Sequence, residues 1–102
     1  MRVAITGSTE LLWDTAALLK YVTNCTYPHQ PDLIITTNEE GTAQSAREMA
    51  EEYGIPLFVM GDMYAAIDNC EMSICLRKAD EYPYAARYST EKGRLFKEYV
   101  KS

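Results

Sequence analysis

Segments typical of β-strands and of α-helices alternate along this chain, and that alternation limits the fold more than any other feature. Short runs of branched apolar residues are separated by longer stretches in which apolar residues recur at helical spacing. The expected strands are 2–6, 32–37, 55–60 and 70–77, and the expected helices are 10–24, 42–53, 62–69 and 90–101. Segment 78–89, which contains Pro83, is expected to form an ordered loop. This order predicts a parallel sheet joined by right-handed crossovers.

Turn and cap residues stand at the expected boundaries of these elements. Ser8 or Thr9 can cap the first helix, Gly54 suits the residue after the second helix, and Pro56 opens the third strand. The sequence therefore predicts the α/β class, with one Rossmann-like domain over residues 1–102. We expect about four parallel strands with helices on both faces of the sheet.

Composition supports one compact domain. Of 102 residues, 47% are hydrophobic, and no repeat or linker interrupts them. No apolar run approaches the roughly 20 residues of a membrane span, and no secretion signal is visible, so we expect a cytoplasmic protein without membrane contact. Three cysteines without a CxxC pair and a single histidine, His29, favour free thiols over disulfides or a zinc site. No metal or cofactor is expected.

Charge is unevenly distributed. The net charge is −5, which makes a nucleic-acid partner unexpected. Residues 1–70 hold three basic against ten acidic residues, or −7, and residues 71–102 hold seven against five, or +2. The C-terminal third could therefore face an anionic ligand, with Arg77 at the end of the fourth strand as a phosphate partner. A solvated helix of mixed charge over 90–102 explains the same balance.

Small polar residues follow the first two strands, where ligands bind in open parallel sheets. Each turn precedes a helix, whose N-terminus favours an anion such as phosphate. Tight turns and helix caps would use the same residue types, and neither a GxGxxG motif nor a P-loop occurs. The candidate ligand-binding residues are Gly7, Ser8, Thr9, Thr37, Asn38, Gly41, Thr42 and Arg77.

Several motifs resemble those of a known family. Thr6-Gly7-Ser8 after the first strand, Asp32-Leu33-Ile34-Ile35, and Gly54-Ile55-Pro56-Leu57 are similar to the SLOG superfamily, nearest its YspA-like branch. That Rossmann-like group includes the DNA-processing protein DprA and the LOG phosphoribohydrolases. The resemblance covers roughly residues 1–62, while residues 63–102 match nothing in the family. It implies a nucleotide or nucleotide-derived ligand, such as an ADP-ribose-like molecule or a cyclic nucleotide. It also implies a sensor or a sequestering protein in microbial or phage conflict.

The second turn departs from the family pattern. The glycine-rich motif is replaced by Thr36–Gln44, in which only Gly41 and Thr42 match, and the acidic residue of the hydrolases falls near Gln44. A glutamine cannot act as a general base, so we expect binding rather than catalysis. The enzymatic alternative is a nucleotide hydrolase or N-glycosidase that uses Glu39, Glu40 or Asp62 instead. Asp62 would serve equally well as a helix cap.

A third hypothesis is an interaction module with an empty cleft. Trp13 should lie partly exposed on the first helix, and an exposed tryptophan on a small domain suggests a homo-oligomer, although core burial is an alternative. Tyr82, Tyr84 and Tyr88 would then pack against the sheet or against a second subunit.

Overall fold

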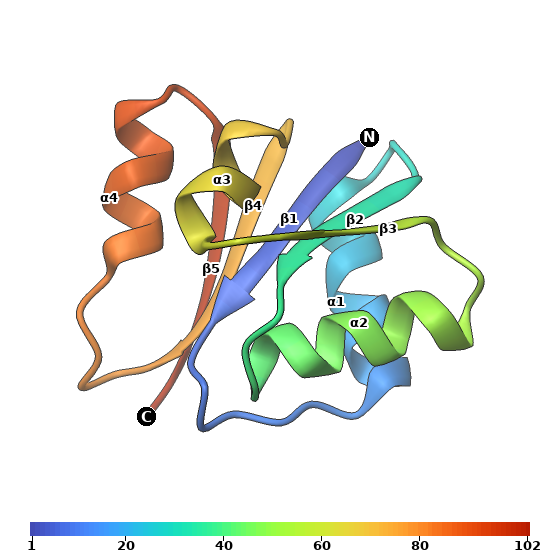
Figure 1. The fold of residues 1–102 in the computed structure, drawn as a ribbon, viewed down its shortest axis with the longest axis horizontal. Helices are drawn as coiled ribbons and strands as arrows, with labels where there is room; N and C mark the ends of the chain where they lie inside the picture. The colour runs from blue at the N-terminus through green and yellow to red at the C-terminus, as the bar shows by residue number, and fades with distance from the viewer.

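A computed structural model describes all 102 residues and contains one sheet of five parallel strands. The strands are β1 (Arg2–Gly7), β2 (Leu33–Thr37), β3 (Leu57–Met60), β4 (Met72–Lys78) and β5 (Leu95–Lys101). The helices are α1 (Thr15–Thr26), α2 (Thr42–Glu52), α3 (Met63–Asp68) and α4 (Tyr84–Glu91). The strand order is β3-β2-β1-β4-β5 (Figure 1). None of the four helices has the length and apolar character that a membrane crossing requires.

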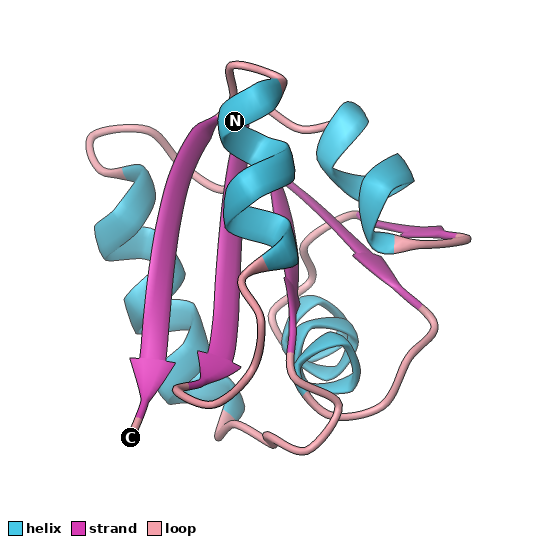
Figure 2. Ribbon diagram, turned by 90° about the vertical axis from the view of Figure 1, so that its left-hand side faces the viewer, coloured by secondary structure: helices cyan, strands magenta, loops and turns pink.

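Helices cover both faces of the sheet, which confirms the predicted α/β fold. The sheet runs between the two helix pairs (Figure 2), with α1 and α2 packed together on one face and α3 and α4 on the other. Val3 and Ile5 of β1 face α1 and α2, whereas Ala4 between them packs with Ala66 of α3. Because side chains alternate along a strand, burial on both faces requires the nearly continuous apolar runs seen in the sequence.

Two predictions for the C-terminal third of the chain are wrong. Residues 84–89 of the expected loop belong to α4, and most of the expected final helix is the strand β5, so the sheet has five strands where about four were expected. Leu95 and Tyr99 are four residues apart, which is the spacing of apolar residues on one face of a helix. Pairing with β4, in register from Met72 with Leu95 to Lys78 with Lys101, determines the structure instead.

The start of α1 is a further correction. The helix begins at Thr15 rather than at residue 10, because Asp14 caps it and accepts a hydrogen bond from the Ala17 amide at 3.0 Å. Neither Ser8 nor Thr9 is its N-cap. Trp13 therefore precedes the helix; it is half-buried and packs edge-on against Tyr99, with ring centroids 5.0 Å apart.

Other predicted boundaries are confirmed. Gly54 follows α2 with a φ of +68°, a conformation that favours glycine. Asp62 caps α3, since its carboxylate accepts a hydrogen bond from the Ala65 amide at 2.8 Å.

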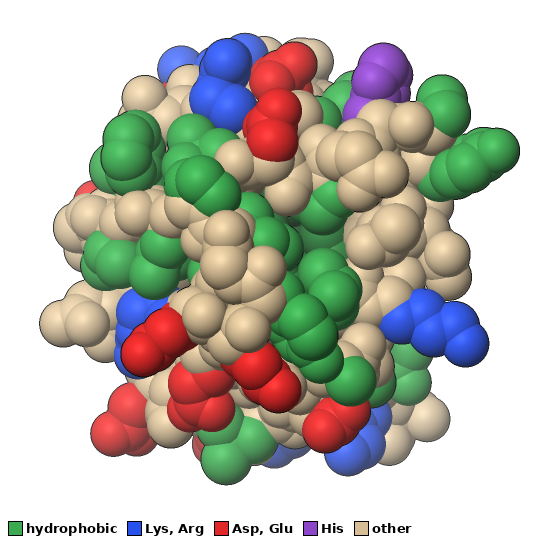
Figure 3. Space-filling model, turned by 90° about the vertical axis from the view of Figure 1, so that its right-hand side faces the viewer, with side chains coloured by type: hydrophobic (Ala, Val, Ile, Leu, Met, Phe, Trp, Pro, Cys, Tyr) green, Lys and Arg blue, Asp and Glu red, His purple; other side chains and the backbone are tan.

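The outer strand β3 is only partly covered. It pairs with β2 alone, and Phe58 and Val59 are about half exposed, at 55% and 48%. Figure 3 shows the side of the molecule on which β3 and α2 lie, with hydrophobic side chains gathered across its centre and acidic ones below them. The sheet thus ends here in an uncharged strand.

Candidate functional site

A cavity of about 470 Å³ opens at the C-terminal ends of β1 and β4. The chain leaves β1 toward the α1 side of the sheet and leaves β4 toward the α4 side, so this is the point at which the strand order reverses. Ligands in open α/β sheets bind at such a point. The lining residues are Thr6, Gly7, Ser8, Glu39, Met63, Tyr64, Cys75, Arg77, Glu81, Tyr82, Tyr84 and Ala85.

Two buried side chains from neighbouring strands form the base of the cavity. Thr6 of β1 and Cys75 of β4 are partners in the parallel register, and each is only 3% exposed. The Thr6 hydroxyl has no hydrogen-bond partner within the protein. Burial raises the pKa of the Cys75 thiol to about 12, so it is protonated at neutral pH. A hydroxyl that is buried without a partner is costly, and this one lines a cavity.

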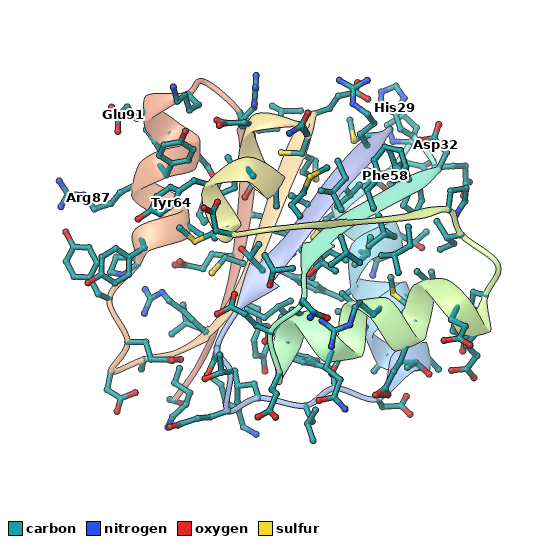
Figure 4. The ribbon with its side chains drawn as sticks, in the orientation of Figure 1. His29, Asp32, Phe58, Tyr64, Arg87 and Glu91 are labelled. Atoms are coloured by element: carbon teal, nitrogen blue, oxygen red, sulfur yellow. The ribbon has the colours of Figure 1, made fainter.

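Aromatic side chains form the outer wall. Tyr64 stands in the first turn of α3, on the side facing α4 (Figure 4), and packs edge-on against Tyr88 at 4.7 Å. The Tyr82 and Tyr84 rings lie 4.5 Å apart, and the Tyr82 hydroxyl accepts a hydrogen bond from Arg87 at 2.8 Å. Tyr82 and Tyr84 stay more than half exposed, so they do not bury against the sheet. Such rings offer faces for stacking.

Arg77 lines the cavity, but other groups of the protein already bind its guanidinium. Nε and Nη2 donate to the Glu98 carboxylate at 2.9 and 3.2 Å, and Nη1 donates to the carbonyls of Lys78 and Glu81 at 3.2 and 3.0 Å. The hydrogen bonds with Glu98 raise the pKa of Arg77. Its charge is therefore balanced before any ligand arrives.

Two carboxylates give the cavity an acidic lining. One Glu81 oxygen accepts from the Lys78 amide at 2.7 Å, and one Glu39 oxygen accepts from the Thr37 hydroxyl at 3.0 Å. The Lys78 side chain pairs with Glu10, so it supplies no free positive charge. The cavity thus favours groups that donate hydrogen bonds to carboxylates.

Gly7 and Ser8 of the first predicted turn lie in the cavity lining, and close packing explains the glycine. A Cβ on Gly7 would lie 2.0 Å from the Leu76 carbonyl oxygen, which accepts a hydrogen bond from the Ser8 amide at 2.9 Å. Only a residue without a side chain allows β1 and β4 to approach so closely at this point.

The second predicted turn is packed against the first. The Thr42 amide donates to the Ser8 carbonyl at 2.9 Å, and the Thr42 hydroxyl donates to the Leu76 carbonyl at 3.3 Å. A Cβ on Gly41 would lie 2.5 Å from the Ser8 carbonyl oxygen. The N-terminus of α2 thus donates to the Ser8 carbonyl at the position where we expected a phosphate to bind. The remaining predicted residues, Thr9, Thr37, Asn38, Gly41 and Thr42, lie outside the cavity lining.

The candidates for catalysis are dispersed. Glu39 lines the cavity, but Glu40 and Asp62 do not, and Asp62 is engaged as the α3 cap. His29 lies near Asp32 at the opposite end of the sheet (Figure 4). No group of three or more His, Cys, Asp or Glu side chains is arranged to hold a metal ion.

Several lining residues were not predicted as a ligand site, notably Met63, Tyr64, Cys75, Glu81 and Ala85. One signal was available: Cys75 and Arg77 are two apart, so they share a face of β4. Met63 and Tyr64 belong to α3, whereas Glu81 and Ala85 lie just before and within α4, where the sequence predicted a loop. Comparisons of the chain with models of protein families, with curated proteins and with solved structures found no match.

Proposed function

We propose that this protein binds a nucleotide-derived small molecule, with the nucleoside part inside the cavity between β1 and β4. The observation that carries the proposal is the unpartnered Thr6 hydroxyl at the base of a 470 Å³ cavity at the reversal of strand order. Small-molecule sites are typically about 300–1,000 Å³, with apolar walls and a few converging polar groups.

Each part of a nucleoside has a complementary group here. The faces of Tyr64 and Tyr84 suit a heteroaromatic base, and the carboxylates of Glu39 and Glu81 suit ribose hydroxyls. A phosphate is poorly matched inside, because Glu98 balances Arg77. Phosphates of the ligand would therefore remain at the cavity mouth.

We propose that the protein binds this ligand without converting it. Of the three acids considered for a hydrolase, Glu40 and Asp62 lie outside the cavity lining, and Glu39 alone lines it. The resemblance to the SLOG superfamily extends the proposal to sensing or sequestering a nucleotide signal. A hydrolase would release free base from an added nucleotide, and Glu39→Gln would abolish that release.

The test has two steps. Mass spectrometry of small molecules released by heat from the purified protein should detect a nucleotide-derived compound. Titration calorimetry with a nucleoside should then show weaker binding to Tyr84→Ala by about 5- to 150-fold, the range for loss of one stacked base. Tyr53→Ala, at the residue that follows α2 and outside the cavity lining, is the control and should bind normally. Equal affinities of the two variants would contradict the proposed stacking.

We also propose self-association through β3. This strand carries no charge and leaves one edge unpaired, whereas the opposite edge strand β5 carries Lys97 and Lys101, which discourage edge pairing. Two copies can pair β3 with β3 antiparallel about a twofold axis. Sedimentation should show a dimer that Val59→Lys disrupts and that Val100→Lys on β5 preserves. A monomer at every concentration would refute this second proposal.

A further inference from the structure

The first turn of α4 has main-chain donors without acceptors. Its N-cap is Pro83, which offers no side-chain hydrogen bond, and the Tyr84 amide is satisfied by the Tyr82 carbonyl. The Ala85 amide has no acceptor, although this residue is only 3% exposed and lines the cavity. By contrast, carboxylates cap α1 and α3, and the Ser8 carbonyl meets α2. An unsatisfied helix N-terminus attracts a hydrogen-bond acceptor.

The Thr6 hydroxyl is a second, independent donor at the same cavity. It comes from the sheet rather than from a helix, it is buried, and it too lacks a partner. Since buried polar groups in folded proteins are almost always paired, a ligand acceptor is the natural partner for both donors.

The charges around these donors restrict the kind of acceptor. Glu81 belongs to the turn that leads into α4 and is half-buried, with one carboxylate oxygen bound to the Lys78 amide. Glu39 adds a second carboxylate, and Glu98 balances Arg77. An anionic acceptor would meet net negative charge, so a neutral carbonyl fits better. The free oxygen of Glu81 then requires a donor from the ligand.

We infer that the ligand presents the cyclic amide edge of an oxopurine base, as in hypoxanthine or guanine. The ring carbonyl accepts from the Ala85 amide and the Thr6 hydroxyl, and the adjacent ring N–H donates to Glu81. Adenine carries the reverse pattern, with an amino donor and a ring-nitrogen acceptor at the same positions. That pattern would place the adenine amino group against the Ala85 N–H and the lone pair of the ring nitrogen against the Glu81 carboxylate. This inference rests on the proposed function, because it requires a base in the cavity.

Inosine and adenosine test this directly, because they differ only at this edge. Calorimetry on the full chain should give at least tenfold tighter binding of inosine than of adenosine, since an unpaired polar group in a binding site is strongly rejected. Glu81→Gln should weaken inosine binding about tenfold and leave adenosine binding unchanged. Glu91→Gln, a charge-matched change on α4 outside the cavity lining, should leave both affinities unchanged.

The outcomes separate the two proposals. If neither nucleoside binds, the proposed function fails and takes the inference with it. If both bind with equal affinity, or adenosine binds more tightly, the proposed function stands and the oxopurine inference is overturned. Loss of inosine binding in Thr6→Val, with circular dichroism unchanged, would support the inference. Retained binding there would refute the role of the hydroxyl.

Discussion

Replacing Thr6 with valine should make the ligand-free protein more stable. Valine has nearly the same shape, so the change removes only the hydroxyl, which is buried and has no partner in the protein. Relieving an unsatisfied buried polar group is worth about 1–3 kcal/mol. Taking the lower figure, the melting temperature of a domain of about 100 residues should rise by roughly 4–8 °C. Urea unfolding, followed by the fluorescence of Trp13, measures the free energy of unfolding.

Thr36→Val is the matched control. Thr36 is also fully buried in the sheet, on β2, but its hydroxyl donates to the Ile5 carbonyl at 2.6 Å. Removing that hydrogen bond should lower the free energy of unfolding by about 1 kcal/mol. The two variants should therefore shift stability in opposite directions. If both destabilise the protein to a similar extent, Thr6 has a partner in solution, and its hydroxyl loses its value as evidence for a ligand.

Three further predictions concern packing, thiol chemistry and pH. Gly7→Ala should lower the free energy of unfolding by at least about 3 kcal/mol, because the added Cβ would overlap a main-chain carbonyl of β4. Gly54→Ala places its Cβ in open space at φ +68° and should lower it by only about 1 kcal/mol, and urea titration measures both changes. The Cys75 thiol, with its pKa raised to about 12, should resist iodoacetamide at pH 8 until urea unfolds the chain, as followed by mass spectrometry. The Met1 ammonium donates to the Asp32 carboxylate at 2.8 Å and lowers the pKa of that carboxyl. Asp32 therefore stabilises the fold at neutral pH and loses this effect as the pH falls below about 4. Asp32→Asn should therefore be less stable than the parent at pH 7, and the difference should shrink at acid pH; a constant difference would contradict the ion pair.

The first three strands follow from the sequence because clear turn residues bound each of them and because β1 and β2 are buried on both faces. Ile34 and Ile35 face opposite sides of the sheet and are both fully buried, so they form the continuous apolar run of a covered parallel strand. An outer strand such as β5 is half-exposed and mixes charges with apolar residues. Leu95 and Tyr99 then match a helix as well as a strand, and only pairing with β4 decides between them.

The site was predictable in part for a related reason. Gly7 and Arg77 lie at the C-terminal ends of β1 and β4, and the sheet brings both to the cavity. Thr42 looked equally suitable, but a helix N-terminus binds a ligand only when no main-chain carbonyl occupies it. Here the Ser8 carbonyl occupies the N-terminus of α2, and such a tertiary contact cannot be recognised from the local sequence.

The strand order has a consequence for how the chain folds. The first strand to be synthesised, β1, lies in the middle of the sheet, and Val3 pairs on one side with Ile34 and on the other with Met72. Its second side can pair only after β4 has been synthesised. Pairings between such distant residues carry a high contact order, which slows folding and prolongs the exposure of an unpaired apolar strand. Both strands that hold the cavity, β1 and β4, meet in this late step, so a ligand can bind only after the slowest part of folding is complete.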